Sequence, residues 1–236
     1  MKKNTLIFGG TKGIGQVIAK RLKSRGDNVI NFARSISENK KNIKIDLSNE
    51  LSIANSLKKI NYIKKIDNII FSQRYRGTNW KEDFQVSVFS IDQILKILKN
   101  KISKNGSVIL ISSISNKAIV HDQELAYHLT KSSQEQMIKY YAVRLGKKKI
   151  RFNCVLPTKL IKPENSKFFK KEVKGKKIYK IISKITPLNK MSESSDVAKV
   201  VEFLTSDNSS YLTGLSIPID GGAALQSPES IVKILK

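Results

Sequence analysis

One tyrosine and one lysine in the chain have the spacing of a proton-transfer pair. Tyr127 and Lys131 are separated by three residues, so a helix would place both on one face. A nearby ammonium group stabilises a phenolate, which allows a tyrosine to exchange a proton with a carbonyl or an alcohol. With so many lysines, roughly one such spacing is expected by chance, so the surrounding sequence must decide its meaning.

A hydroxyl group stands shortly before this pair. Residues 107–111 predict a buried strand, and Ser112 and Ser113 follow it directly. Ser113 would hold the oxygen of a substrate beside the hydroxyl of Tyr127. A serine at the end of a strand is more often a turn residue, and the downstream tyrosine and lysine are what favour the catalytic interpretation.

A glycine-rich turn follows the first apolar run, residues 5–8, and precedes an amphipathic helix pattern at residues 14–24. Glycine is needed where a chain turns tightly and where backbone approaches a pyrophosphate, and the start of the helix offers free N–H groups. The alternative is a glycine-rich turn that binds nothing. The predicted cofactor contacts in the turn are Gly9, Thr11, Lys12, Gly13, Ile14 and Gly15.

The residues after the second strand bear on the choice of cofactor. An NAD site usually has an acidic residue there, which accepts a hydrogen bond from the ribose 2′-hydroxyl. This chain has Arg34 instead, and Lys12 lies in the glycine turn. Two cations would meet a 2′-phosphate, so NADP(H) is favoured over NAD(H), although an ordinary lysine-rich surface also explains them. Asp46 is expected either to bind the adenine amino group or to cap a helix that begins near Ser48.

Short apolar runs alternate along the chain with longer amphipathic stretches. This order predicts an α/β fold, a three-layer, doubly wound parallel sheet of about seven strands with helices on both faces. Residues 1–236 are expected to form one domain, in which the lysine-rich residues 158–190 are an insertion that caps the substrate. The expected strands are 5–8, 28–33, 43–45, 69–71, 107–111, 151–155 and 216–219, and the expected helices are 14–24, 91–101, 126–145 and 195–204.

The chain is strongly basic, with a formal net charge of +25. Such a charge can indicate a surface for nucleic acid or for an anionic membrane. The lysines are scattered, however, with a denser run between residues 159 and 184, which is typical of a solvated surface. No apolar run approaches the roughly 20 residues that a membrane helix needs. We therefore expect neither a nucleic acid nor a membrane as a partner.

Two features favour the cytosol. The apolar run at residues 5–8 is too short for a secretory signal and ends in glycines. Cys154 is the only cysteine, so an internal disulfide is impossible, which fits a reducing compartment. The protein is expected to be cytoplasmic, and no residue is assigned as a metal ligand.

Taken together, these motifs resemble the short-chain dehydrogenases/reductases almost from end to end. The resemblance rests on the glycine turn, on residues 109–113, 127–131 and 150–157, and on a series of segments between residues 187 and 222. It implies a Rossmann-type fold that binds a nicotinamide dinucleotide and an oxidoreductase that acts on it.

The resemblance also gives each chemical residue a role. Tyr127 would be the acid/base, Lys131 would favour its phenolate and bind the nicotinamide ribose, and Ser113 would orient the substrate carbonyl. Hydride would pass directly between the nicotinamide and the carbonyl carbon, which leaves positioning and electrostatics to the protein. The further cofactor contacts that the resemblance implies are Asp46, Leu47, Ser72, Gln73, Tyr127, Lys131 and Pro157.

Three places depart from the usual residues of the family. Residues 71–74 read Phe-Ser-Gln-Arg where Asn-Asn-Ala-Gly is usual, and Thr158 follows Pro157 where glycine is usual. Ser87 aligns with an asparagine that holds a proton-relay water, and we include it in the catalytic set as a weaker ligand for that water. These changes surround the cofactor and leave the serine, tyrosine and lysine in place, so we interpret them as divergence within the family.

The sequence supports two functions on one fold. The first is an NADP(H)-dependent oxidoreductase that interconverts a ketone and a secondary alcohol. The second is a non-catalytic dinucleotide-binding sensor or scaffold, which the altered residues 71–74 and Ser87 would suit. Fold alone does not decide between them, because both place the same turn against the same cofactor.

The expected partners are a small carbonyl or alcohol substrate and further copies of the chain. Arg74, Arg76 and the basic run at residues 159–184 favour an anionic substrate, such as a nucleotide sugar or a carrier-bound acyl thioester, although a solvated lid explains the same residues. The resemblance implies a homotetramer or a homodimer that assembles through the helices near residues 91–101 and 126–145.

Overall fold

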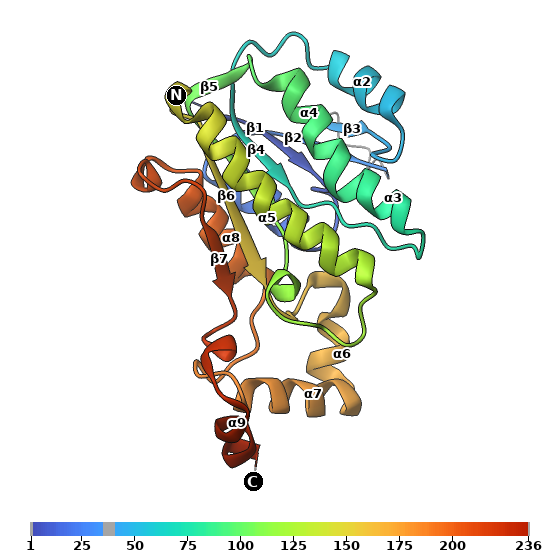
Figure 1. The fold of residues 1–236 in the computed structure, drawn as a ribbon, viewed down its shortest axis with the longest axis vertical. Helices are drawn as coiled ribbons and strands as arrows, with labels where there is room; N and C mark the ends of the chain where they lie inside the picture. The colour runs from blue at the N-terminus through green and yellow to red at the C-terminus, as the bar shows by residue number, and fades with distance from the viewer. Residues whose placement is uncertain (1, 35–40, 236) are drawn as a thin grey trace.

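The fold is built on a seven-stranded parallel sheet, seen in a computed structural model that describes residues 2–34 and 41–235. The strand order is β3-β2-β1-β4-β5-β6-β7, so the chain winds outward from β1 in one direction and then from β4 in the other (Figure 1). This is the doubly wound topology that the sequence predicts. The strands are β1 Asn4–Phe8, β2 Asn28–Ala33, β3 Asn42–Lys44, β4 Ile66–Phe71, β5 Ile102–Ile111, β6 Arg151–Pro157 and β7 Ser216–Ile219.

Helices cover both faces of the sheet, which confirms the expected three layers. Helices α1 and α8 pack on one face, while α2, α4 and α5 pack on the other, where α4 and α5 lie side by side in Figure 1. Among the residues that the structure describes, no helix is long and apolar enough to cross a bilayer. The helices are α1 Gly13–Ser24, α2 Glu50–Lys58, α3 Trp80–Phe84, α4 Ser90–Leu98, α5 Leu125–Leu145, α6 Ser166–Lys171, α7 Val173–Lys184, α8 Ser194–Leu204 and α9 Pro228–Leu235.

The central strands are buried on both faces, which explains their continuous apolar sequence. In β1, Leu6 and Phe8 belong to the core under α4 and α5, whereas Ile7 belongs to the core under α1 and α8. Phe8 stacks on Phe32 of β2 and on Phe71 of β4, with ring centroids 4.7 and 5.1 Å apart. These contacts join the carboxyl ends of three neighbouring strands, directly before the loops that form the site.

Strand β5 is longer than the sequence predicts. It begins at Ile102 rather than near residue 107, because the chain passes through Asn105 with a positive φ of 70° and then resumes the strand. Its pairing with β4 shifts register between Ile66 and Asn68 at this irregularity. Polar residues at the irregularity interrupt the apolar pattern, so only the second half of the strand is recognisable from sequence.

Residues 158–190 form a small helical unit at the carboxyl ends of the strands. Its helices α6 and α7 project past the strand arrowheads in Figure 1, close to α9. Phe169, Ile161 and Met191 are buried together in a core of their own, separate from the two cores of the sheet. The unit is therefore held by its own apolar contacts next to the loops that follow the strands.

Candidate active site

A cleft of about 600 Å³ opens where the direction of winding changes, between the carboxyl ends of β1 and β4. Loops on either side of this point diverge to opposite faces of the sheet, which leaves a crevice for a ligand. The sequence-predicted residues that line the cleft are Gly9, Thr11, Lys12, Gly13, Ile14, Arg34, Asp46, Leu47, Ser72, Gln73, Ser113, Tyr127, Lys131 and Pro157. The structure does not bring Gly15 or Ser87 to the cleft surface.

The glycine turn has no room for side chains at two of its positions. A Cβ on Gly9 would lie 2.7 Å from the backbone nitrogen of Gln73, and the φ of Gly9 is +82°. A Cβ on Gly15 would lie 2.1 Å from the carbonyl oxygen of Gly9. Gly15 is buried, so its part is to let the first turn of α1 pack against the glycine turn. The result is a strip of backbone without side chains that fits the close approach of a diphosphate.

The first turn of α1 leaves its backbone donors free for a ligand. Lys12 is the N-cap residue of this helix, and its side chain makes no capping hydrogen bond. The unsatisfied N–H groups and the partial positive charge of a helix start suit an anion. Backbone shape and helix polarity thus both fit the diphosphate of a dinucleotide.

Two exposed cations line the cleft, Lys12 in the glycine turn after β1 and Arg34 directly after β2. Asp46 lies in the same region and accepts hydrogen bonds from the backbone N–H and the hydroxyl of Ser48, at 2.9 and 2.7 Å. These bonds, and to a smaller extent the charge of Arg34, lower the pKa of Asp46. The alternative that Asp46 caps the next helix is wrong, because Asn49 is the N-cap residue of α2 and accepts from the N–H of Ser52.

The chemical residues lie at the other end of the cleft. Tyr127 and Lys131 share one face of α5, with the lysine Nζ 5.4 Å from the centroid of the tyrosine ring. Ser113 follows β5, and its Oγ accepts a hydrogen bond from the backbone N–H of Ser115 at 3.2 Å. All three side chains face one cleft, as their spacing in the sequence predicts.

Lys131 is buried and depends on a side chain that the sequence analysis missed. Burial lowers the pKa of its ammonium group to about 8, and the charge of Arg74 acts in the same direction. Its Nζ donates a hydrogen bond to Oε1 of Gln134 at 3.2 Å. Gln134 is buried one helical turn after the lysine on α5, and this spacing is the signal that could have identified it.

Ser87 is connected to Lys131 through that glutamine. The Nε2 of Gln134 donates to the carbonyl oxygen of Ser87 at 2.8 Å, so the backbone of Ser87 holds the amide in place. The hydroxyl of Ser87 points elsewhere and donates to Oδ1 of Asp83 at 2.6 Å. Ser87 lies in a π-helical turn, Gln85–Phe89, which joins α3 to α4. The hydroxyl of Ser87 is thus engaged with Asp83, and its role as a water ligand stays a prediction.

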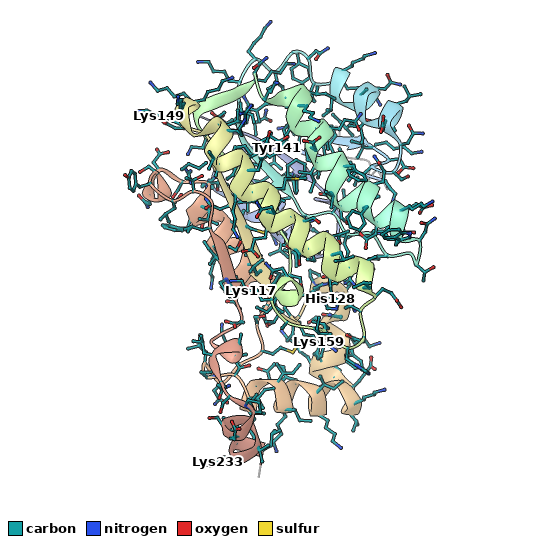
Figure 2. All side chains as sticks on the ribbon, viewed as in Figure 1. Lys117, His128, Tyr141, Lys149, Lys159 and Lys233 are labelled. Atoms are coloured by element: carbon teal, nitrogen blue, oxygen red, sulfur yellow. The ribbon has the colours of Figure 1, made fainter. Side chains whose placement is uncertain are left out.

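His128 anchors the loop in front of α5 to that helix. Its two ring nitrogens lie 3.1 Å from the carbonyl oxygen of Ser115 and 3.3 Å from that of Val120. Figure 2 shows His128 at the end of α5 nearest to Lys117 and to Lys159 of the following helical unit. The side chain fixes the segment after Ser113 rather than facing the substrate.

Arg74 follows β4 and lies against the ring of Tyr127. Its guanidinium carbon is 5.0 Å from the centroid of the Tyr127 ring, and its Nη2 donates to Oε1 of Gln123 at 2.7 Å. Lys162 lines the same part of the cleft, where burial lowers its pKa and the charge of Arg74 lowers it further. The departure from the usual family residues thus places a cation beside the Tyr127 ring.

Comparison with known proteins decides the family. A family model described as Enoyl-(Acyl carrier protein) reductase matches residues 9–224. A solved short chain dehydrogenase family protein from Francisella tularensis is 30% identical with a TM-score of 0.82, over 96% of this chain and 100% of that one. The chain belongs to the short-chain dehydrogenase/reductase family.

Curated members of the short-chain dehydrogenase/reductase family are similar to this chain over nearly their whole length. L-xylulose reductase of Bos taurus is 26% identical, over 93% of this chain and 96% of its own. The 7alpha-hydroxysteroid dehydrogenase of Clostridium sardiniense is 25% identical, over 96% and 95%. The protein is therefore an oxidoreductase of this family.

Proposed function

We propose that this short-chain dehydrogenase/reductase uses NADP(H) to interconvert a ketone and a secondary alcohol. The observation that carries the proposal is the common cleft: Ser113, Tyr127 and Lys131 line the same crevice as the glycine turn. The turn and the free start of α1 would hold the diphosphate, and the nicotinamide would then supply or accept the hydride at the substrate carbon.

The protein's part in reduction is to hold the carbonyl and to deliver a proton. The hydroxyl of Ser113 donates a hydrogen bond to the carbonyl oxygen and orients it. Tyr127 gives its phenolic proton to that oxygen as the hydride reaches the carbon, so the ketone becomes an alcohol and the tyrosine a phenolate. The ammonium of Lys131 stabilises this phenolate. Oxidation of an alcohol follows the same steps in reverse.

The preference for NADP(H) is supported by Lys12 and Arg34. Both are exposed and both line the cleft, and Arg34 stands after β2, where an NAD site uses an acid. A 2′-phosphate between them would gain two cationic partners, which NAD(H) cannot use.

A reductase assay with a tyrosine variant tests the reaction. NADPH oxidation is followed over a panel of ketones, with Tyr127→Phe as the test and Tyr62→Phe, an exposed tyrosine outside the cleft, as the matched control. Loss of the proton donor should lower kcat by roughly 10²- to 10⁴-fold. Activity that survives in Tyr127→Phe would contradict the role of this residue. An α,β-unsaturated thioester in the panel tests whether the reaction is carbon–carbon double-bond reduction instead.

The second candidate is a dinucleotide-binding protein without catalysis. It is supported by residues 71–74, which differ from the usual family sequence, and by Ser87, whose hydroxyl is engaged with Asp83. Calorimetry and the ketone panel together separate the candidates. This one predicts that NADPH binds but that no ketone of the panel is reduced.

We also propose that residues 158–190 cap the substrate within a single-domain chain. Lys159, Leu160, Lys162 and Glu164 already line the cleft from this unit. Reaction in the cytosol is supported by Cys154, the only cysteine of the chain, which is buried as a free thiol.

Assembly into a homotetramer, or at least a homodimer, is supported by apolar side chains on the outer face of α4 and α5. Ile97, Tyr140 and Val143 are exposed on these two helices, which lie in front of the sheet in Figure 1, and Phe89 is exposed directly before α4. Light scattering should report a mass larger than one chain, and Val143→Asp should reduce it.

A further inference from the structure

Arg74 is a cation placed against the ring of Tyr127, and its hydrogen-bond partner is a neutral amide. It lies over the Tyr127 ring at 5.0 Å, and its guanidinium donates to the neutral amide of Gln123. That single bond uses one of the five N–H donors of the guanidinium. The remaining donors belong to an exposed side chain that lines the cleft, within reach of a substrate on Tyr127.

Arg74 lies between lysines and acids: Lys131 and Lys162 feel its positive charge, while Asp83, Asp122 and Glu124 line the adjoining part of the cleft. The pKa values of Lys131 and Lys162 are lowered first by burial and then, in both cases, by the charge of Arg74. Glu164 opposes this effect at Lys162, but it also lies 4.0 Å from the guanidinium of Arg76. An anion near Arg74 would therefore relieve repulsion that is present in the protein alone.

The anions of the cofactor are accounted for elsewhere. The diphosphate belongs at the glycine turn and the start of α1, and a 2′-phosphate belongs near Lys12 and Arg34, after β1 and β2. Arg74 follows β4 and contacts Tyr127, at the end of the cleft where the carbonyl must lie. The group that pairs with Arg74 is then part of the substrate.

We propose that Arg74, assisted by Lys162, forms a subsite for an oxyanion on the substrate, and that the substrate is a small ketone bearing a carboxylate or a phosphate near its carbonyl group. This inference rests on the proposed function. The planar guanidinium matches either oxyanion with two parallel hydrogen bonds, and the lysine adds a point charge. The contact would hold the carbonyl against Ser113 and Tyr127.

The test compares charged ketones with neutral counterparts that carry the same carbonyl group. Pyruvate and 3-oxobutanoate are paired with their methyl esters, and dihydroxyacetone phosphate with dihydroxyacetone. The quantity measured is the ratio of kcat/KM for the charged and the neutral member of each pair. Intrinsic reactivity cancels when this ratio is compared between the wild-type protein and a variant, and the carboxylate and phosphate pairs show which oxyanion the subsite accepts.

Arg74→Met removes the proposed partner, and Lys167→Met is the matched control. Lys167 is an exposed cation on α6 that does not line the cleft, so its loss changes the net charge alone. We expect Arg74→Met to lower the charged-to-neutral ratio roughly 10- to 100-fold for at least one pair. Arg74→Lys should fall between, because it keeps the charge and loses the fork.

Three results would overturn the subsite. Arg74→Met could lower kcat/KM equally for charged and neutral ketones, which would make Arg74 a partner of the Tyr127 phenolate only. It could weaken NADPH binding by as much as it weakens the charged ketones, which would assign the arginine to the cofactor. Finally, Arg74→Met could leave the ratio of kcat/KM for charged and neutral ketones at its wild-type value.

A binding measurement separates failure of the subsite from failure of the proposed reaction. Malonate has two carboxylates and no ketone, so calorimetry on the protein–NADPH complex detects the subsite without turnover. Malonate binding that depends on Arg74, with no ketone reduced, supports the subsite and contradicts the reaction. Reduction of neutral ketones with no malonate binding contradicts the subsite and leaves the reaction in place.

Discussion

At one end of the cleft the ligand surface is made of backbone, and at the other end it is made of side chains held by other side chains. The glycine turn gains its shape from the absence of side chains at Gly9 and Gly15. At both positions, backbone atoms lie within 3 Å of the place that a Cβ would occupy. The chemical end is different, because Lys131 is held by Gln134 and Gln134 by the carbonyl oxygen of Ser87.

The comparison teaches that the two ends should fail in different ways. A backbone surface is destroyed by any added volume, whatever its charge. A buried polar network tolerates a change of similar volume but responds to a change of charge or hydrogen bonding, since each group depends on its neighbour for satisfaction. Substitutions can therefore break the first end through shape and the second through electrostatics.

The largest effect is expected from Gly15→Ala. Its methyl group would lie 2.1 Å from the carbonyl oxygen of Gly9, so α1 must move away from the turn. We expect NADPH affinity to fall by roughly 100-fold or more, with a stability loss of about 1–3 kcal/mol from overpacking. Fluorescence titration of NADPH and thermal unfolding measure the two quantities separately.

Gly146→Ala is the control for that change. A Cβ there meets nothing within 4 Å, and its φ of −58° suits alanine. Affinity and stability should both stay near the wild-type values. Equal losses in Gly146→Ala and Gly15→Ala would refute the idea that shape at the turn is what matters.

Substitutions at Gln134 should shift a pH profile rather than abolish binding. Lys131 loses its proton as the pH rises through about 8, so its support for the phenolate is present below that pH and lost above it. Gln134→Leu removes a hydrogen-bond acceptor from the ammonium and should lower this pKa further. Gln134→Glu adds a negative charge and should raise it. The alkaline limb of the kcat/KM profile should therefore move by roughly one pH unit. It should move to lower pH in Gln134→Leu and to higher pH in Gln134→Glu.

The exposed Gln136 on the same helix provides matched controls. Gln136→Leu and Gln136→Glu make the same chemical changes two residues away, without contact to the lysine. Their pH profiles should coincide with that of the wild-type protein. If the Gln134 variants also coincide with it, the glutamine is a packing residue and does not tune Lys131.

The same contrast explains what the sequence could predict. The sheet, its order of winding and the glycine turn follow from local patterns, because each strand is an apolar run and each tight turn needs its glycine. Tyr127, Lys131 and Ser113 are recognisable by spacing. Gln134 is not, because its meaning depends on the carbonyl of Ser87, which a separate helical segment brings to it.

Arg74 shows a second limit of the sequence. Its position after β4 predicts a place near the cleft, but its contact with the Tyr127 ring depends on how far α5 stands from the end of β4. Asp46 shows the reverse case, where two local roles were open and the structure assigns the cap of α2 to Asn49 instead. The local sequence pattern predicts the helices, strands and turns. The distances between these elements decide which polar side chains come into contact.

A smaller effect on cofactor binding is expected from substitution of Arg34, the cation that follows β2. Arg34→Ala should weaken NADPH binding by about 10-fold and leave NADH binding nearly unchanged, because only NADPH has the 2′-phosphate. Arg34 is exposed, so added salt should reduce the difference. Lys20→Ala, an exposed cation on α1 outside the cleft, is the control. A parallel loss for both cofactors would remove the 2′-phosphate from the explanation.

The smallest effect is expected from Glu164→Gln. Here the charge of a side chain acts on the backbone surface of the glycine turn. Oε1 of Glu164 lies 3.1 Å from the position that a Cβ on Gly13 would occupy, so a carboxylate faces the backbone that should receive the diphosphate. Like charges repel, and the side chain is 42% exposed, so the repulsion is partly screened by solvent. Removal of the charge should tighten NADPH binding by about two- to fivefold at low salt and less at high salt.

Glu172→Gln is the control, because Glu172 is an exposed acid of the same unit outside the cleft, and it should have no such effect. Weaker binding in Glu164→Gln would instead mean that Glu164 helps the turn by holding Arg76 in place.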